Sequence, residues 1–365
     1  MLTTLLLVLT LIYALMIIAF TAGAAASQYP TDLQYRPRVS IIVAARNEED
    51  KIAECLNSLS ALTYPHNLLE LILVDDRSTD ATPAIVRQYM ERCPYLRLVQ
   101  IGAETELRPG KMNAVTQGID ASTGEILLFT DADCRVPKGW VENIVKYYTD
   151  SSIGTVAGFT SLLGTGLFSR LQALDWFYLF SVAAATARMR FPVTAVGTNL
   201  SVRRAAYESV GGYRKIPFSV TEDYALFHAV TEAGFHARFP RDMHTLVETF
   251  PCASWKQLYS QKVRWFTGGR GMDVKSLLIF AFPYIFNLLI AISAILFEAP
   301  LLYWAIGVKL LVDLVLFLPS LSTFKRISLL RSFFAFELYY YCYVLIFPPL
   351  VLFGKKVEWK ERTFE

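Results

Sequence analysis

Hydrophobic residues are distributed unevenly along the chain, with two apolar ends and a middle of mixed polarity. Residues 2–26 carry no charged side chain, and residues 277–353 are again strongly apolar. At a rise of about 1.5 Å per residue, the first stretch can cross a hydrocarbon core of about 30 Å. Within the second stretch we expect spans near residues 277–297, 300–319 and 333–353. The pattern therefore predicts four membrane-spanning helices.

The N-terminal apolar stretch has a rival interpretation as a cleaved signal peptide, because small residues suited to cleavage lie between Ala22 and Ser27. However, the stretch is longer than an ordinary signal-peptide core of about 7–15 residues, and no basic segment precedes it. These features favour a retained anchor.

The middle of the chain, residues 33–270, alternates short apolar runs with amphipathic stretches. The apolar runs, which predict buried strands, are Val39–Val43, Leu69–Val74, Leu96–Ile101 and Glu125–Phe129. The amphipathic stretches, which predict helices, lie near residues 49–60, 79–92, 111–122 and 138–149. This alternation predicts an α/β fold with a parallel sheet covered by helices on both faces. Ligands of such sheets bind beyond the carboxyl ends of the strands.

The expected organisation follows from these patterns. It comprises an N-terminal anchor at residues 1–27, an α/β domain at 33–270, C-terminal transmembrane helices at 277–353 and a basic tail at 354–365. Basic residues follow the first anchor and lie between the last two spans, at Arg36, Arg38, Lys325, Arg326 and Arg331. The positive-inside rule assigns both clusters to the cytosol. The α/β domain is then cytosolic and both termini lie outside.

The C-terminal tail does not agree with this topology, because its basic residues would also prefer the cytosol. These residues are Lys355, Lys356, Lys360 and Arg362. Alternatively, Pro348 and Pro349 break the last apolar segment into a re-entrant or interfacial element.

Three ionisable residues, Lys309, Asp313 and Glu337, interrupt the apolar C-terminal region. Two interpretations stay open. They line an internal polar path, or they lie near the ends of spans and reach the interface.

Composition narrows the class of protein. Apolar residues make up 54% of the 365 residues and charged residues 18%, and the net charge is only +3, too small to indicate a nucleic-acid partner. The five cysteines form no CxxC pair, and the four histidines show no metal-ligand spacing. A disulfide framework and a zinc site are both disfavoured.

Acidic residues follow the first two predicted strands, at Glu48 and at Asp75-Asp76. Carboxylates in this position can accept hydrogen bonds from ribose hydroxyls or from a base N–H. Nearby Ser78 and Asp80 suit the cap and first turn of the next helix. Capping alone does not explain the doubled aspartate.

A second acidic motif, Asp131-Ala132-Asp133, follows the fourth predicted strand. In an extended chain, residues two apart point to the same side, so the two carboxylates form a hard oxygen site suited to Mg²⁺ or Mn²⁺. Such an ion can neutralise a departing diphosphate. A solvated loop is the alternative.

The motif Thr221-Glu222-Asp223 opens a helix that we expect to reach about Gly234. Thr221 suits the cap and the acids suit the positive helix end, which is a complete structural explanation. In the functional interpretation, the helix end keeps Asp223 ionised and ready to accept the proton of an acceptor hydroxyl.

The motif Gln261-Lys262-Val263-Arg264-Trp265 lies in a predicted helix that begins near Ser254. Gln261, Arg264 and Trp265 fall on one face. Arg264 suits a diphosphate, and Trp265 suits stacking on a sugar or an acceptor. An amphipathic helix on the membrane surface is an alternative that is compatible with these contacts.

Two further polar groups are candidates for binding. Lys111 and Asn113 open the third predicted helix, where a lysine opposes the helix dipole and so indicates an anionic partner such as a phosphate. Gly197, Thr198 and Asn199 follow an apolar stretch that we take for a strand, and we expect them to border the acceptor site.

Taken together, the acidic pair, the DxD, the TED and the QxxRW occur in an order that resembles the family 2 glycosyltransferases of GT-A fold. The resemblance covers about residues 36–270. Membrane-bound relatives include cellulose, hyaluronan and poly-N-acetylglucosamine synthases and ceramide glucosyltransferases.

The resemblance implies a nucleotide-sugar donor, a Mg²⁺ or Mn²⁺ cofactor and an inverting displacement. By resemblance, Glu48, Asp75 and Asp76 hold the nucleotide, a uridine, and Asp131 and Asp133 lie at the diphosphate with Asp133 on the metal. Asp223 is the base, with Glu222 beside it. The residues that complete the donor and acceptor site are Gln261, Arg264 and Trp265.

The chain has fewer expected membrane helices than the long-chain polymerases need around a polymer channel. We therefore expect transfer of a hexose to a lipid acceptor, with Gly166–Ala187 at the membrane interface. A small processive polysaccharide synthase is the alternative. We expect an integral protein of a bacterial cytoplasmic membrane.

Overall fold

The computed structural model describes residues 2–27, 29, 31–102, 110–269, 272–296, 299–352, 357–359 and 362–364. By their contacts the residues form two compact units. Unit 1 consists of Met1–Ala26, Gly164–Met189 and Pro251–Glu365, and unit 2 consists of Ser27–Leu163 and Arg190–Phe250. Lys355, Lys356 and Lys360, on which the question of the tail depends, lie outside the described residues.

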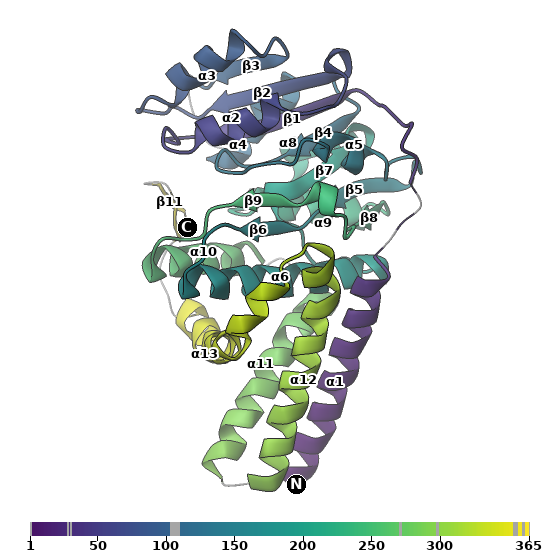
Figure 1. Ribbon diagram of the computed structural model, residues 1–365, viewed down its shortest axis with the longest axis vertical. Coiled ribbons are helices and arrows are strands. Elements are labelled where there is room, and N and C mark those ends of the chain that lie inside the picture. Colours follow the sequence, from purple (N-terminus) through teal and green to yellow (C-terminus); the bar gives the residue numbers. More distant parts are fainter. Residues whose placement is uncertain are drawn as a thin grey trace. The chain divides into compact units, whose positions relative to one another are not determined.

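Unit 2 is built on a seven-stranded sheet of order β3-β2-β1-β4-β7-β5-β8 (Figure 1). Its strands are β1 (Val39–Ala45), β2 (Leu69–Asp75), β3 (Leu96–Gln100), β4 (Ile126–Phe129), β5 (Ile153–Ala157), β7 (Leu200–Arg203) and β8 (His236–Arg238). The short strands β6 (Thr160–Leu162) and β9 (Val247–Thr249) form a separate parallel pair. The first four strands pair in parallel, as predicted. Their near-continuous apolar runs fit burial on both faces.

The second half of the sheet departs from the parallel prediction, because β7 runs antiparallel to both β4 and β5. Phe129 at the end of β4 pairs with Leu200 at the start of β7. The chain therefore re-enters the sheet at the edge where β4 ends and runs back. This arrangement brings the residues before β7 next to those that follow β4.

Helices cover both faces of the sheet, as predicted. Successive residues of a strand point their side chains to opposite faces of the sheet, so the two faces have separate cores. Ile41 and Val43 belong to the larger core, which includes residues of α2 (Ile52–Ser60), α3 (Thr82–Met90) and α5 (Trp140–Val145). On the other face, Ile72 and Val74 of β2 pack with Ala114 of α4 (Lys111–Asp120). Unit 2 also contains α7 (Arg204–Ser209), α8 (Gly212–Lys215) and α9 (Glu222–Glu232).

Unit 1 contains the long apolar helices. Its helices are α1 (Leu2–Ala25), α6 (Leu167–Arg188), α10 (Trp255–Gly268), α11 (Val274–Ile295), α12 (Ala299–Thr323) and α13 (Phe333–Leu352). Among the described residues, four segments are long and apolar enough to cross a membrane: Leu2–Ala25, Val274–Ile295, Pro300–Thr323 and Ile327–Pro349. Four such segments agree with the number predicted. Both Pro348 and Pro349 lie inside α13, so the helix continues through them.

The ionisable residues of the apolar region, Lys309, Asp313 and Glu337, meet inside unit 1. The Lys309 ammonium lies 2.8 Å from an Asp313 oxygen and 2.5 Å from a Glu337 oxygen. The Tyr13 hydroxyl of α1 donates to Asp313 at 2.7 Å. All three charged side chains are buried, so they do not reach an interface. Their contacts tie α1, α12 and α13 together.

Candidate functional site

Polar residues gather in unit 2 at the carboxyl edge of the parallel strands. Two loops, which follow β1 and β2, begin the site. Asn47 and Arg77 in these loops have positive φ angles of 50° and 56°. Asparagine adopts this conformation readily, but it is unfavourable for arginine, and such strain often accompanies functional loops. The Asn47 side chain accepts from the Thr79 N–H at 2.9 Å and so joins the two loops.

The carboxylates of the first two strands are held within this network. Asp75 and Asp76 are buried, and Asp75 accepts hydrogen bonds from the Ser78 N–H at 3.2 Å and from Gln100 at 3.4 Å. Asp76 pairs with Arg77 at 3.3 Å. Glu48 is half-buried, and its backbone N–H donates to a threonine of α3.

The expected capping role of Ser78 is wrong, whereas Asp80 contacts the start of the helix as expected. Helix α3 begins at Thr82, later than predicted, and Ala81 occupies the cap position. The Ser78 hydroxyl instead accepts from the Asn47 N–H at 3.0 Å. Asp80, in contrast, accepts from the backbone N–H of Thr82, the first residue of α3, at 3.0 Å and so does stabilise the start of the helix.

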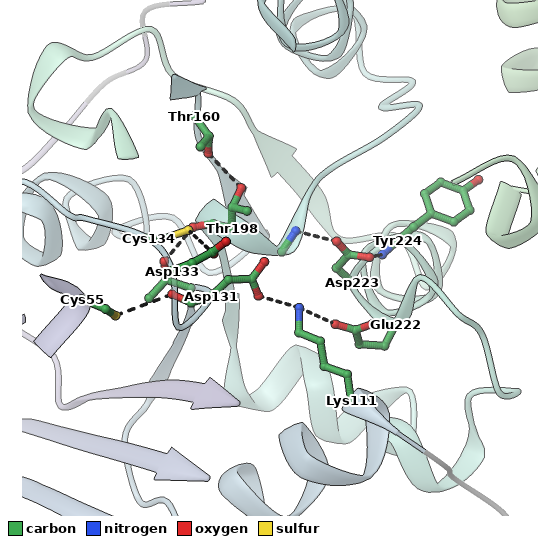
Figure 2. Close-up of polar contacts among 12 residues, drawn as sticks. Cys55, Lys111, Asp131, Asp133, Cys134, Thr160, Thr198, Glu222, Asp223 and Tyr224 are labelled. Carbon is green, nitrogen blue, oxygen red and sulfur yellow. Dashed lines mark hydrogen bonds and ion pairs between the residues drawn. The ribbon is translucent and has the colours of Figure 1, made fainter. Parts of the chain in front are cut away.

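Lys111 joins the two acidic motifs that follow in the sequence (Figure 2). Its ammonium lies 2.6 Å from Asp131 Oδ1 and 3.0 Å from Glu222 Oε1. The Lys111 side chain is 19% exposed and that of Glu222 only 8%. The lysine at the start of α4 thus has the anionic partners that its position predicts, and they are carboxylates of the protein itself.

This cluster perturbs the ionisation of its members. Burial alone would lower the pKa of Lys111, but the charges of Asp131, Glu222 and Asp223 outweigh burial and raise the pKa. Lys111 therefore stays protonated at neutral pH. Burial raises the pKa of Glu222, although Lys111 opposes the shift.

Asp133, the second member of the DxD, has a different partner. Lys51, just before α2, lies 3.7 Å from Asp133, and the two side chains are 40% and 27% exposed. Both aspartates therefore contact a lysine, which is partly buried at Asp131 and exposed at Asp133. Lys51 is not singled out by sequence reasoning, because nothing in its neighbourhood of Glu49 and Asp50 marks it as different from a surface charge.

Asp223 lies in the first turn of α9 and is held by backbone donors. The Gly197 N–H donates to Asp223 Oδ2 at 2.5 Å, and the Tyr224 N–H donates to Oδ1 at 2.8 Å. A Cβ on residue 197 would lie 3.1 Å from Asp223 Oδ2. A glycine at this position lets the backbone approach the carboxylate closely.

Gly197, Thr198 and Asn199 form a 3-10 turn, η2 (Gly197–Asn199), that precedes β7. The expectation that they follow a strand is wrong. The Thr198 carbonyl accepts from Thr130 at 2.9 Å, and its hydroxyl contacts the hydroxyl of Thr160 at 2.9 Å.

The Asn199 side chain connects this turn to the core by hydrogen bonds. Its amide oxygen accepts from the Trp140 indole at 3.0 Å, and its amide nitrogen donates to the carbonyls of Phe159 and Thr245. The residue is 1% exposed. Its side chain thus holds η2 against the core. Asn113, in the first turn of α4, is also buried.

A small pocket lies at the centre of these residues. Its polar lining consists of Lys111, Thr130, Asp131, Gly197, Tyr213, Glu222 and Asp223. Tyr213 is absent from the residues predicted for the site. Its hydroxyl donates to the backbone carbonyl of Glu222 at 3.1 Å. In the sequence, the Gly211-Gly212 pair just before Tyr213 marks a turn of the chain ahead of α9, and both glycines have positive φ angles.

The QxxRW motif lies on α10 in unit 1, in a helix that begins where predicted, with Ser254 as the cap. The Trp265 ring lies 5.6 Å from the ring of Trp176 in α6. Between the motif residues, Lys262 is buried and forms an ion pair with Asp175 of α6. Burial alone would lower the pKa of Lys262, but Asp175 raises it.

Comparisons with known proteins agree with this fold. The profile described as Glycosyl transferase family 2 matches residues 40–211, and that of Glycosyl transferase family group 2 matches residues 126–354. A probable glycosyltransferase of Bacillus subtilis, YdaM, is 26% identical over 90% of this chain and 84% of its own length. A beta-monoglucosyldiacylglycerol synthase of Synechocystis is 31% identical over 52% of this chain, which spans 39% of that protein.

Among solved structures, a mannosyltransferase of Pyrobaculum calidifontis, PcManGT, determined with GDP-Man and Mn²⁺, matches with a TM-score of 0.60. The match is 22% identical and covers 93% of this chain and 99% of that one. It confirms the predicted GT-A fold. The second profile alone covers more than half of the chain, so the protein belongs to the family 2 glycosyltransferases.

Proposed function

We propose that this glycosyltransferase moves a hexose from a nucleotide-sugar, taken to be a UDP-hexose, to a lipid in the membrane with inversion at the anomeric carbon. The observation that carries the proposal is the position of Asp223. Its carboxylate lines the same pocket as Lys111 and Asp131, at the start of α9. A carboxylate beside an anion-binding lysine and a DxD suits a base next to a diphosphate leaving group.

The donor nucleotide is proposed to bind at the carboxyl edge of β1 and β2. Glu48, Asp75 and Asp76 would accept hydrogen bonds from the uridine, and Lys111 would contact the diphosphate. Asn113 lies two residues after Lys111 in α4 and is also proposed to contact the donor. Burial of the two aspartates and the hydrogen bonds of their loops support this assignment, because they fix the direction of the carboxylates.

The residues of the DxD are compatible with a divalent metal. Asp131 and Asp133 offer hard carboxylate oxygens, and the described residues contain no cluster of three or more His, Cys, Asp or Glu side chains suited to a metal. Mg²⁺ is commonly held by one or two carboxylates together with substrate phosphates and water. The Pyrobaculum mannosyltransferase was determined with Mn²⁺, and we propose that this chain also uses a divalent ion. A bound ion would neutralise charge on the departing diphosphate.

Residues of the chain itself then accept the proton and position the reacting groups. Asp223 accepts the proton of the acceptor hydroxyl while the oxygen of that hydroxyl forms a bond to the anomeric carbon. The bond to the diphosphate breaks on the opposite side, and the electron pair leaves with that group. The backbone N–H groups of Gly197 and Tyr224 keep the Asp223 carboxylate in place. Glu222, whose carboxylate lies 3.0 Å from the Lys111 ammonium, would hold this lysine close to the leaving group.

A lipid acceptor is supported by the four apolar segments and by the relative named for the synthesis of a glucosyldiacylglycerol. Gly197, Thr198 and Asn199 would shape the acceptor side, with Asn199 acting through its support of η2. Family resemblance, rather than position, supports the proposed roles of Gln261, Arg264 and Trp265. We also infer a bacterial cytoplasmic membrane, with unit 2 in the cytosol. A small processive polysaccharide synthase is the alternative, and it predicts a ladder of polymers.

Asp223→Asn tests the assignment of the base. In the full chain reconstituted in nanodiscs with lipid and Mn²⁺, we expect transfer to fall by about 10²–10⁴-fold, because the amide cannot accept the proton. Binding of UDP should change by less than about threefold, since a general base acts on the acceptor rather than on the nucleotide. Asp120→Asn, which alters an exposed aspartate paired with Arg214, is the matched control and should transfer normally. Full transfer by Asp223→Asn would rule out this base.

A further inference from the structure

The lysines at the DxD carry an inference about the order in which metal and donor bind. Lys111 contacts Asp131 at 2.6 Å, and Lys51 contacts Asp133 at 3.7 Å. Each proposed metal-binding carboxylate therefore already has a cationic neighbour. The contact at Asp131 is the closer and more buried of the two, and Glu222 holds the same ammonium from the other side at 3.0 Å.

The ammonium of Lys111 acts as an internal counter-ion in this arrangement. A divalent ion on Asp131 would lie within a few ångströms of a partly buried like charge, where Coulomb repulsion is stronger than in bulk water. An ion that takes Asp131 Oδ1, the oxygen that Lys111 contacts, must displace the ammonium, and Glu222 would keep the ammonium nearby. A metal without a donor is therefore disfavoured by the protein's own cation.

A nucleoside diphosphate removes this conflict. Its phosphate oxygens can accept hydrogen bonds from the Lys111 ammonium and coordinate the metal at the same time. The ammonium then contacts a phosphate in place of Asp131. Each of the two ligands then favours the binding of the other, and the coupling must be reciprocal.

We propose that Lys111 couples metal binding to donor binding: it blocks Asp131 in the donor-free enzyme and moves to the diphosphate when the donor arrives. This inference rests on the proposed function and adds an order to it. The metal binds weakly alone and tightly with the nucleotide, which prevents the site from filling with metal before the substrate is present.

Titration with Mn²⁺ tests the coupling without any sugar acceptor. Free Mn²⁺ is measured by electron paramagnetic resonance with the purified full chain, first alone and then with saturating UDP or GDP. In the wild type, we expect a nucleoside diphosphate to tighten Mn²⁺ binding by about tenfold or more. Lys111→Met should bind Mn²⁺ about tenfold more tightly than the wild type without nucleotide. The effect of the nucleotide on this variant should be correspondingly smaller.

Two variants control for charge and for folding. Lys51→Met removes the exposed lysine at Asp133, and we expect a change below about fivefold because exposed pairs are screened. Lys111→Arg keeps the cation and should bind Mn²⁺ as weakly as the wild type. Thermal unfolding of each variant establishes that it is folded.

The inference is overturned if folded Lys111→Met binds Mn²⁺ no more tightly than the wild type without nucleotide. It is also overturned if Lys51→Met or Lys111→Arg tightens binding as much as Lys111→Met does, or if Lys111→Met keeps the full effect of the nucleotide. A failure to find a glycolipid product would contradict the proposed function, but the metal titration would still be interpretable.

Discussion

Glu70, a single residue of β2, joins neighbouring segments of the sheet away from the pocket. Its Oε1 atom accepts from the Ser40 hydroxyl at 2.5 Å and from the backbone N–H groups of Thr123 and Gly124. Burial alone would raise the pKa of Glu70, but these hydrogen bonds outweigh it and lower the pKa below the ordinary value of 4.5.

The sign of this shift predicts how stability depends on pH. Because the folded pKa is below the unfolded one, ionised Glu70 stabilises the fold above the ordinary pKa of 4.5, and this contribution is lost as the pH falls through the folded pKa. Glu70→Gln should therefore lower the unfolding temperature at about pH 7, and the difference from the wild type should narrow in acid. Thermal unfolding across this pH range measures it.

Glu91→Gln is the matched control, since Glu91 is exposed at the end of α3. This substitution should leave the unfolding temperature nearly unchanged. A difference between wild type and Glu70→Gln that stays constant down to acid pH would contradict the role given to the ionised form.

Single residues could be predicted where local physics decides their environment. The lysine at the start of α4 indicates an anionic partner, because it opposes the helix dipole, and Lys111 indeed contacts Asp131 and Glu222. Ser78 was assigned wrongly because its partner, the Asn47 N–H, lies 31 residues earlier in the sequence. Contacts between loops of this kind follow from tertiary packing and leave no local signal.

At the scale of elements, the helices α1, α12 and α13 depend on the buried ion cluster of Lys309, Asp313 and Glu337. Removing one member of such a cluster leaves the others uncompensated. Lys309→Met should therefore destabilise the protein by about 3–5 kcal/mol. Thermal unfolding in detergent would detect the change as a clear fall in the unfolding temperature.

Two comparisons make this prediction specific to the cluster. Lys275→Met removes an exposed lysine at the start of α11 and should have little effect. Adding Asp313→Asn and Glu337→Gln to Lys309→Met should recover part of the loss, because no buried charge then lacks a partner. A Lys309→Met protein as stable as Lys275→Met would mean that the cluster does not hold the helices together.

The elements that could be predicted are those with strong periodicity. The strands β1, β2, β3 and β4 and the helices between them appear in the order expected, because each apolar run is long enough to be buried. The antiparallel direction of β7 could not be predicted, since it depends on where the chain re-enters the sheet. Its position matters, because it brings Gly197 to Asp223.

At the scale of the whole molecule, contacts rather than sequence order define the two units. Helices α6 and α10 group with the apolar helices, although their residues lie within the polar middle of the chain. Buried contacts explain this grouping, as in the ion pair of Lys262 with Asp175. The sequence predicts an interfacial position for Gly166–Ala187 and allows one for the helix of the QxxRW motif, but it does not predict the ion pair that joins the two helices.

The central claim is that the protein transfers one sugar to a membrane lipid with inversion. The most direct measurement is the structure of the product formed by the purified full chain from lipid, UDP-hexose and Mn²⁺. Mass spectrometry gives the number of sugars per lipid, and the coupling constant of the anomeric proton gives the configuration. We predict a glycolipid with a single hexose whose configuration is opposite to that of the donor. A polymer ladder, or a product with the donor's configuration, would contradict this function.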